Sequence, residues 1–191
     1  MSFLDDYLAD VTALIDELDH EAITRALEVL KTAHAAGQRV FLCGNGGSSA
    51  TAAHMVNDLT KMPMTIGRNG LRAINLSDNV PLLMAISNDI AYADIFVMPL
   101  KVHFVPGDVV IGISASGNSE NVIRAVEYAN ANGGVTIGLC GFTGGRLHDL
   151  AQIPLYVANN KYGPVEDAHC IVLHALAYWF LDELKREGGR A

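Results

Sequence analysis

The feature that most constrains this chain is a recurring short apolar run that ends in small polar residues. The runs lie in the segments RVFLCGNGGSS, LRAINLSD, DVVIGISASGNS, VTIGLCGFTGG and IPLYVANN. Strands buried on both faces form continuous apolar runs of this kind. Segments of helical character separate the runs, at about 48–62, 79–88, 91–104, 118–132 and 164–187. Alternating strands and helices predict an α/β fold, a three-layer α/β/α sandwich around a parallel sheet of about five strands.

The first 37 residues carry a helical pattern instead. Apolar residues recur there at spacings of three and four, which is typical of one face of a helix, at Leu4, Leu8, Val11, Ile15 and Leu18. After a break near Asp19, the spacing is repeated by Ile23, Leu27 and Leu30. We therefore predict two helices. Their apolar stripe either covers the chain's own domain or packs on a partner subunit.

Length and composition indicate one globular domain. The chain has 191 residues, of which 50% are hydrophobic and 18% charged, and disordered chains show the reverse balance. The formal net charge of −8 excludes nucleic acid and anionic membrane surfaces as expected partners. A small anion remains a possible ligand, because backbone N–H groups at a helix N-terminus bind anions without net positive charge.

The cysteines and the N-terminal segment favour a cytoplasmic location. The three cysteines, Cys43, Cys140 and Cys170, are widely spaced and form no disulfide or zinc-ribbon pattern, which fits a reducing compartment. The segment MSFLDDYLADV carries acids where a signal peptide carries bases. No apolar run approaches the ~18 residues of a membrane span. We expect a cytoplasmic protein with no membrane partner.

The first glycine-rich loop leaves a predicted strand and enters a predicted helix. It reads Gly44-Asn45-Gly46-Gly47-Ser48-Ser49. Ligands of parallel α/β sheets bind at the carboxyl ends of the strands, where this loop falls. A dinucleotide-binding loop would have glycine in place of Ser49 and an acidic residue at a strand end about 20 residues on, so no nucleotide cofactor is expected. The loop is either a site for an oxyanion or sugar hydroxyls, or a plain structural turn.

The second loop has the chemistry of a phosphate site. It reads Ser114-Ala115-Ser116-Gly117-Asn118-Ser119 and opens the helix at 118–132. Hydroxyls and free N–H groups at a helix N-terminus suit a phosphate, whose oxygens accept several hydrogen bonds. The loop has no lysine, which argues against a nucleoside triphosphate. The alternative is that its serines only cap the helix.

Acid–base residues recur at helical spacing. His54 and Asp58 are four apart and share a helix face, and so do Glu166, Cys170 and His174 on the last helix. Each group also has a plain interpretation, as a surface pair, a carboxylate at a helix N-terminus or a core histidine. The pair Asn88-Asp89 could hold sugar hydroxyls or simply end its helix.

These motifs together resemble the sugar isomerase (SIS) domain, and within it the sedoheptulose 7-phosphate isomerase, or phosphoheptose isomerase, family. The resemblance rests on the N-terminal helical pair, CGNGGS, AISND, GDVVIGISASGNSENVI and the last helix with His174, and it covers nearly the whole chain. It implies the SIS fold, with one domain over residues 1–191. It also implies a homotetramer with active sites between subunits, in which 1–37 join the assembly and 38–191 form the α/β core.

The resemblance assigns roles to individual residues. The phosphate would be bound by Ser48 and by the hydroxyls of Ser114, Ser116 and Ser119, while Ala115 replaces a family threonine in the same loop. The other substrate-binding positions are Asn45, Gly46, Gly47, Asp89 and Glu166. His174 matches the catalytic histidine of the family, and His54 matches a zinc ligand of some members.

Two positions depart from the family pattern. The catalytic glutamate is Asp58 here, one methylene shorter, and a glutamine of the last helix is Glu166. A carboxylate and a histidine can still move a proton between neighbouring carbons through an enediol, with Asp58 as base and His174 as acid. Alternatively, zinc or another divalent cation could be held by a metal set of His54, Asp58, Glu166 and His174.

The resemblance therefore predicts a sugar-phosphate aldose–ketose isomerase. The expected reaction converts sedoheptulose 7-phosphate to a D-glycero-D-manno-heptose 7-phosphate type product, with a divalent metal and no nucleotide cofactor. One alternative is an isomerase of a different sugar phosphate. The other is an SIS module that binds a sugar phosphate or a protein without catalysis, which would need the two loops but not Asp58, Glu166 and His174.

Overall fold

The computed structural model describes residues 2–188 and confirms the predicted five-stranded parallel sheet. The strand order is β2-β1-β3-β4-β5, and every neighbouring pair is parallel. The strands are β1 (Arg39–Gly44), β2 (Arg72–Asn75), β3 (Val109–Ser114), β4 (Val135–Cys140) and β5 (Ile153–Tyr156). Because β1 lies between β2 and β3, the loops that follow β1 and β3 are neighbours at the carboxyl edge of the sheet.

The helices agree with the predicted segments apart from two differences. They are α1 (Phe3–Asp16), α2 (His20–Ala36), α3 (Gly47–Met64), α4 (Val80–Asp89), the 3-10 helix η1 (Tyr92–Asp94), α5 (Val97–His103), α6 (Glu120–Ala131), α7 (Gly145–Leu150) and α8 (Tyr162–Gly188). The segment predicted as one helix over 91–104 is divided into η1 and α5. Helix α7 was not predicted, because six residues are too few to show a helical period.

Each face of the sheet packs against its own set of helices. One hydrophobic cluster joins β-strand side chains to α2, α3 and α8, and the other joins them to α4, α5, α6 and α7. Within β1 the side chains alternate, so that Val40 and Leu42 enter the first cluster and Phe41 and Cys43 the second. Full burial raises the pKa of the Cys43 thiol to about 12, which keeps it protonated and unreactive.

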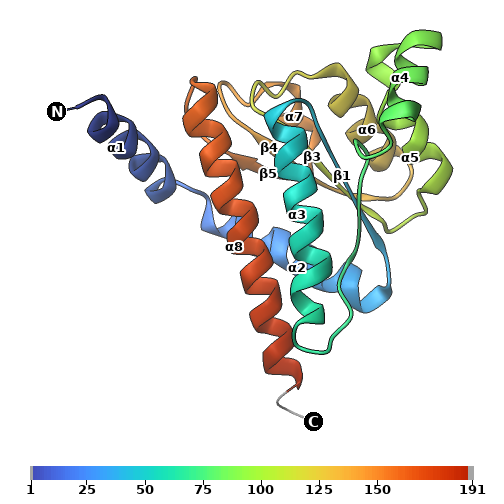
Figure 1. Ribbon diagram of the computed structural model, residues 1–191, viewed down its shortest axis with the longest axis horizontal. Helices are drawn as coiled ribbons and strands as arrows, with labels where there is room; N and C mark the ends of the chain where they lie inside the picture. Colours follow the sequence, from blue (N-terminus) through green and yellow to red (C-terminus); the bar gives the residue numbers. More distant parts are fainter. Residues whose placement is uncertain (1, 189–191) are drawn as a thin grey trace.

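Helix α1 projects from the body of the molecule beside α8 (Figure 1). The Tyr7 hydroxyl donates a hydrogen bond of 2.6 Å to the Asp167 carboxylate, and Leu14 is buried in a small third cluster. The predicted stripe is only partly covered, since Leu4 and Leu8 are 61% and 54% exposed. Within this chain, the start of α1 therefore leaves an apolar surface open.

No helix among residues 2–188 combines the length and the apolar character that crossing a bilayer requires.

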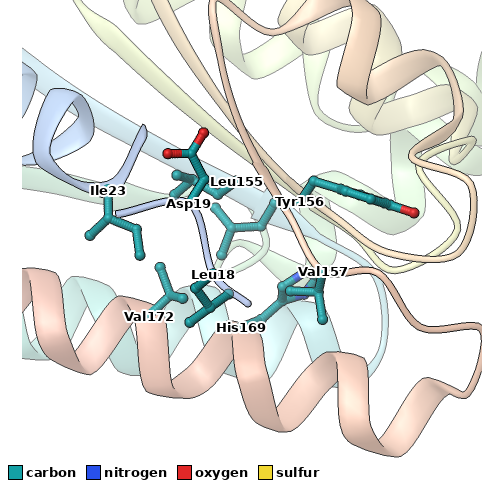
Figure 2. A pocket seen from close by; sticks show the side chains of 9 residues that line it. Leu18, Asp19, Ile23, Leu155, Tyr156, Val157, His169 and Val172 are labelled. Carbon is teal, nitrogen blue, oxygen red and sulfur yellow. The ribbon is translucent and has the colours of Figure 1, made fainter. Parts of the chain in front are cut away.

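A buried histidine lines a small cavity beneath the corner between α1 and α2. Figure 2 shows His169 of α8 with Leu18 and Asp19 of that corner, and with Tyr156 and Val157 at the end of β5. The cavity measures about 10 Å³. Within the described residues, neither ring nitrogen of His169 has a hydrogen-bond partner, and in Figure 2 the Asp19 carboxylate and Tyr156 hydroxyl point away from the ring.

Burial lowers the pKa of His169 from 6.5 to about 4, and the nearby Cys140 backbone, outside hydrogen-bond geometry, opposes this only in part. The unfolded chain therefore binds this proton first, so folding stability decreases as the pH falls from about 6.5 to about 4. At about 1.4 kcal/mol per pKa unit, the loss reaches about 3 kcal/mol. Urea unfolding across this pH range measures this loss. His169→Leu should remove this part of the pH dependence of the unfolding free energy.

The matched control is His103→Gln, which changes an exposed histidine and keeps the wild-type pH dependence. If His169→Leu retains the wild-type slope, His169 is not the group responsible.

Candidate active site

Helices α3 and α8 lie side by side and bring the predicted acid–base residues together in three successive pairings (Figure 1). In order along both helices these are Gly47 with Glu166, Thr51 with Cys170, and His54 and Asp58 with His174. Successive pairings are three or four residues apart, about one helical turn, so the two helices run in the same direction with matching turns in contact. The four-residue spacing on the last helix is therefore a face directed at α3.

The third pairing is a compact group of two imidazoles and one carboxylate. The Nε2 atoms of His54 and His174 are 3.2 Å apart, and Asp58 Oδ2 lies 3.5 Å from the first and 3.8 Å from the second. The Asp58 side chain is only 14% exposed, whereas both histidines reach solvent. The other Asp58 oxygen, Oδ1, accepts a hydrogen bond from Asn57. One carboxylate oxygen thus remains directed at both imidazoles.

The distances within this group are compatible with a metal ion. Ligand atoms at ~2.0–2.2 Å from a tetrahedral zinc lie about 3.3 Å from one another. The ligand atoms of His54, Asp58 and His174 all lie within 4.8 Å of one another. Two imidazoles with a carboxylate are also a common ligand set for zinc.

The structure does not bring Glu166 into this group, although the sequence predicted it as a fourth metal ligand. Glu166 precedes His174 by two helical turns, about 12 Å along α8. Its carboxylate lies instead against Gly47, where an added Cβ would be 2.7 Å from Oε2. Gly47 leaves the space that this carboxylate occupies. The carboxylate is therefore in the first turn of α3, at the positive end of the helix dipole.

The loop that precedes α3 caps the helix without a side chain. Gly46 is the N-cap residue and makes no side-chain capping bond, and Ser48 is buried within the first turn. The serines therefore do not cap α3, and its first N–H groups are left for other partners.

The 114–119 loop holds its hydroxyls close together. The hydroxyl oxygens of Ser114 and Ser119 are 2.9 Å apart, and Ser119 is the N-cap residue of α6 without capping it through its side chain. The Ser116 hydroxyl accepts from the Asn118 backbone N–H. The Ala115 methyl packs in the third hydrophobic cluster, so only the backbone of this residue could face a ligand. The arrangement presents hydroxyls at the N-terminus of a three-turn helix.

Asn45 takes part in a polar network that the sequence did not predict. Its amide pairs with that of Asn121 on α6, and it also accepts from the Tyr92 hydroxyl of η1. Asn121 stood in the NSEN segment next to the predicted loop, whereas nothing in the sequence distinguished Tyr92. The structure leaves Asp89 at the exposed end of α4, bonded to its neighbour Asn88.

Comparison with known proteins agrees with this fold. Residues 6–141 match a family model described as SIS domain. A phosphoheptose isomerase from Trichlorobacter lovleyi is 38% identical over 178 residues, 92% of this chain and 90% of that protein. Phosphoheptose isomerase 2 from Campylobacter jejuni is 32% identical and covers 98% of this chain and 95% of its own.

Solved structures of similar proteins show the same architecture. The phosphoheptose isomerase GmhA from Neisseria gonorrhoeae superposes with a TM-score of 0.85 at 27% identity, covering 93% of this chain and 96% of that chain. A phosphoheptose isomerase from Francisella tularensis gives a TM-score of 0.87 at 26% identity, with 95% of both chains covered.

The five-stranded parallel sheet, its flanking helices and the family match define an SIS-domain protein. The sequence identity and coverage of the relatives assign the chain to one family within this class. The chain belongs to the phosphoheptose isomerase family, whose members are aldose–ketose isomerases.

Proposed function

We propose that this protein interconverts sedoheptulose 7-phosphate and the corresponding D-glycero-D-manno-heptose 7-phosphate aldose. The observation that carries the proposal is the Asp58 carboxylate directed at His54 and His174, on helices that also reach the two polar loops. Chemistry of this class needs a base, an acid and an anchor for the phosphate. The chain has candidates for all three.

The 114–119 loop would bind the phosphate. The hydroxyls of Ser114 and Ser119 meet at the N-terminus of α6, where the helix dipole favours an anion. Ser48 in the first turn of α3 would add to this site. The Glu166 carboxylate in that turn makes the α3 end less favourable for a second negative group, so we assign the phosphate to the α6 end. Glu166 would then accept hydrogen bonds from sugar hydroxyls.

The isomerisation would proceed through an enediol. Asp58 removes a proton from C1 of the ketose, the C1–C2 bond becomes double, and the C2 oxygen receives a proton from His174. The O1 proton then passes to His174 and restores it as the C1 carbonyl forms, and C2 receives the proton held by Asp58, so the product has the same composition and both residues return to their starting state. Asn45 and Asp89 would hold the hydroxyls along the sugar.

As an alternative to this direct proton transfer, we propose that His54, Asp58 and His174 hold a divalent cation, with zinc as the ion that their donor atoms fit best. When bound, such a cation polarises the carbonyl and stabilises negative charge on the enediolate oxygens.

Purified protein is expected to contain about one zinc per chain by elemental analysis. His54→Ala removes one of three ligands, so its zinc affinity should fall by more than about 100-fold, beyond the 10–100-fold typical of losing an outer-shell partner. His148→Ala, an exposed histidine on α7 next to Asp149, is the matched control and should bind zinc like the wild type. Equal zinc binding by the wild type and His54→Ala would contradict the proposed site.

We also propose that the exposed stripe of α1 packs on other copies of this chain, in a homotetramer. Replacing Leu4 and Leu8 by serine should reduce the mass measured by light scattering after size exclusion, because about 1.5–3 kcal/mol of burial is lost per leucine and per copy. Val102→Ser with Val105→Ser removes two other exposed apolar side chains and serves as the control. An unchanged mass for the leucine variant would exclude α1 from the interface.

The function is tested by incubating the wild type with sedoheptulose 7-phosphate and following formation of the aldose phosphate. Sugar phosphates of five and six carbons and unphosphorylated sedoheptulose complete the substrate series. The proposal expects turnover of the seven-carbon phosphate and little turnover without the phosphate. Failure to isomerise any of these sugar phosphates would leave the non-catalytic binding module as the better interpretation.

The three free cysteines fit the reducing cytoplasm that we propose as the location.

A further inference from the structure

The amide of Asn45 has a defined orientation, because its partners form a directional chain. The Val122 backbone N–H donates to Asn121 Oδ1, so this atom of the buried Asn121 must be the oxygen. Asn45 Nδ2 donates to the same oxygen at 3.0 Å, and Asn121 Nδ2 donates back to Asn45 Oδ1 at 2.8 Å. The chain of donors therefore fixes which end of the Asn45 amide is which.

The Tyr92 hydroxyl completes this chain. It lies 2.9 Å from Asn45 Oδ1, and since that atom is a carbonyl oxygen, the hydroxyl must donate. Asn45 Oδ1 then accepts two hydrogen bonds and has little capacity left. Asn45 Nδ2 has two N–H groups and gives one to Asn121, so its second N–H is the polar group that Asn45 can offer a ligand.

Although Tyr92 is 58% exposed, its helical turn is held in place. Asp94 of the same turn forms an ion pair of 2.9 Å with Arg124 of α6, and Arg124 also contacts Glu120 at 3.0 Å. Helix α6 carries Asn121 as well. Helix α6 therefore holds both Tyr92 and Asn121 in place, and the Asn45 side chain forms hydrogen bonds with both.

Asn45 and Tyr92 line a cavity of about 340 Å³ at the carboxyl edge of the sheet. Ser77 lines the same cavity, and its hydroxyl oxygen is buried without a hydrogen-bond partner among the described residues. The free N–H of Asn45 is the polar group that the structure places at this cavity for a ligand.

We propose that Tyr92 is a positioning residue for substrate binding, acting through Asn45. Its hydroxyl donates a hydrogen bond to the Asn45 carbonyl oxygen and thereby fixes the orientation of the amide plane. The free N–H of Asn45 then faces an oxygen of the sugar. This inference rests on the proposed function in taking the ligand to be the sugar phosphate.

The test is Tyr92→Phe, which removes only the hydroxyl. One hydrogen bond contributes about 0.5–1.5 kcal/mol, so KM for sedoheptulose 7-phosphate should rise about 2–12-fold. The value of kcat should stay within about twofold, because a contact made equally in the ground and transition states affects only KM. Tyr128→Phe, which removes a tyrosine hydroxyl from the far end of α6, is the control and should match the wild type.

A double-mutant cycle separates positioning from direct contact. If Tyr92 acts through Asn45, the change of KM on Tyr92→Phe should vanish in an Asn45→Ala background. Persistence of the full effect in that background, or an unchanged KM in Tyr92→Phe, would overturn the proposal.

Nuclear magnetic resonance of the Asn45 side-chain amide provides a readout without turnover. Tyr92→Phe should shift the Asn45 Nδ2 resonances and speed their hydrogen exchange, while Tyr128→Phe leaves them unchanged. Unaltered Asn45 resonances in Tyr92→Phe would refute the positioning role even if the wild type proved inactive. Inactive wild type with shifted resonances would instead count against the proposed function alone.

Discussion

Replacing Asp58 by asparagine lowers kcat for sedoheptulose 7-phosphate by a factor of about 10²–10⁴, the usual range for a positioned general acid or base. The substitution keeps the shape of the side chain, which is 14% exposed, and removes its charge and its basicity. His54 and His174 would face an amide in place of a carboxylate oxygen. Because the fold loses no packing, the loss falls on catalysis and on metal content rather than on stability.

The measurement compares kcat, zinc content and thermal unfolding of the variant with those of the wild type. Asp149→Asn makes the same chemical change at an exposed carboxylate on α7 and should retain full activity. An Asp58→Asn protein that keeps wild-type kcat would exclude Asp58 as the base.

Gly117→Ala has the largest expected effect on stability. Gly117 has a φ of +68°, in the left-handed region, and an added Cβ would overlap the carbonyl oxygen of Gly144, which is backbone and cannot rotate away. Left-handed strain of about 1–2 kcal/mol adds to overpacking of about 1–3 kcal/mol. The 114–119 loop must then move, so KM for the sugar phosphate should rise as well.

Gly37→Ala is the matched control. Gly37 also has a positive φ, of +66°, but nothing lies within 4 Å of its added Cβ. Urea unfolding should show that Gly117→Ala costs more than this control by about 1–3 kcal/mol, the part due to overlap. Equal losses in the two variants would mean that the loop between β3 and α6 adapts without strain.

The sheet could be predicted from the sequence because its strands are buried on both faces. Segments such as 109–114 contain only buried residues, so they read as unbroken apolar runs. Helix α7 could not be predicted, because it is short and begins at Gly145. The stripe of α1 was visible in the sequence, but its spacing is the same whether the helix covers its own domain or another subunit.

Spacing along the sequence predicted those parts of the candidate site that lie within a single helix. Spacing placed His54 with Asp58 and put Glu166 and His174 on one face of the last helix. Spacing did not give the register between α3 and α8, which places Glu166 against Gly47 and away from the metal group. The contact of Tyr92 with Asn45 joins residues 47 positions apart, and no local pattern encodes it.

If the substrate binds as proposed, the strand order also makes its binding affect how long the chain stays folded. In sequence order, β2 pairs with one edge of β1, and β3 then pairs with the other edge of β1. The β1 and β3 loops therefore belong to halves of the sheet that separate when the β1–β3 ladder breaks. A sugar phosphate bound to both loops, as proposed above, would have to leave before that separation, which would slow unfolding and protect the chain from proteolysis. Protein turnover should thus fall when the sugar phosphate is abundant.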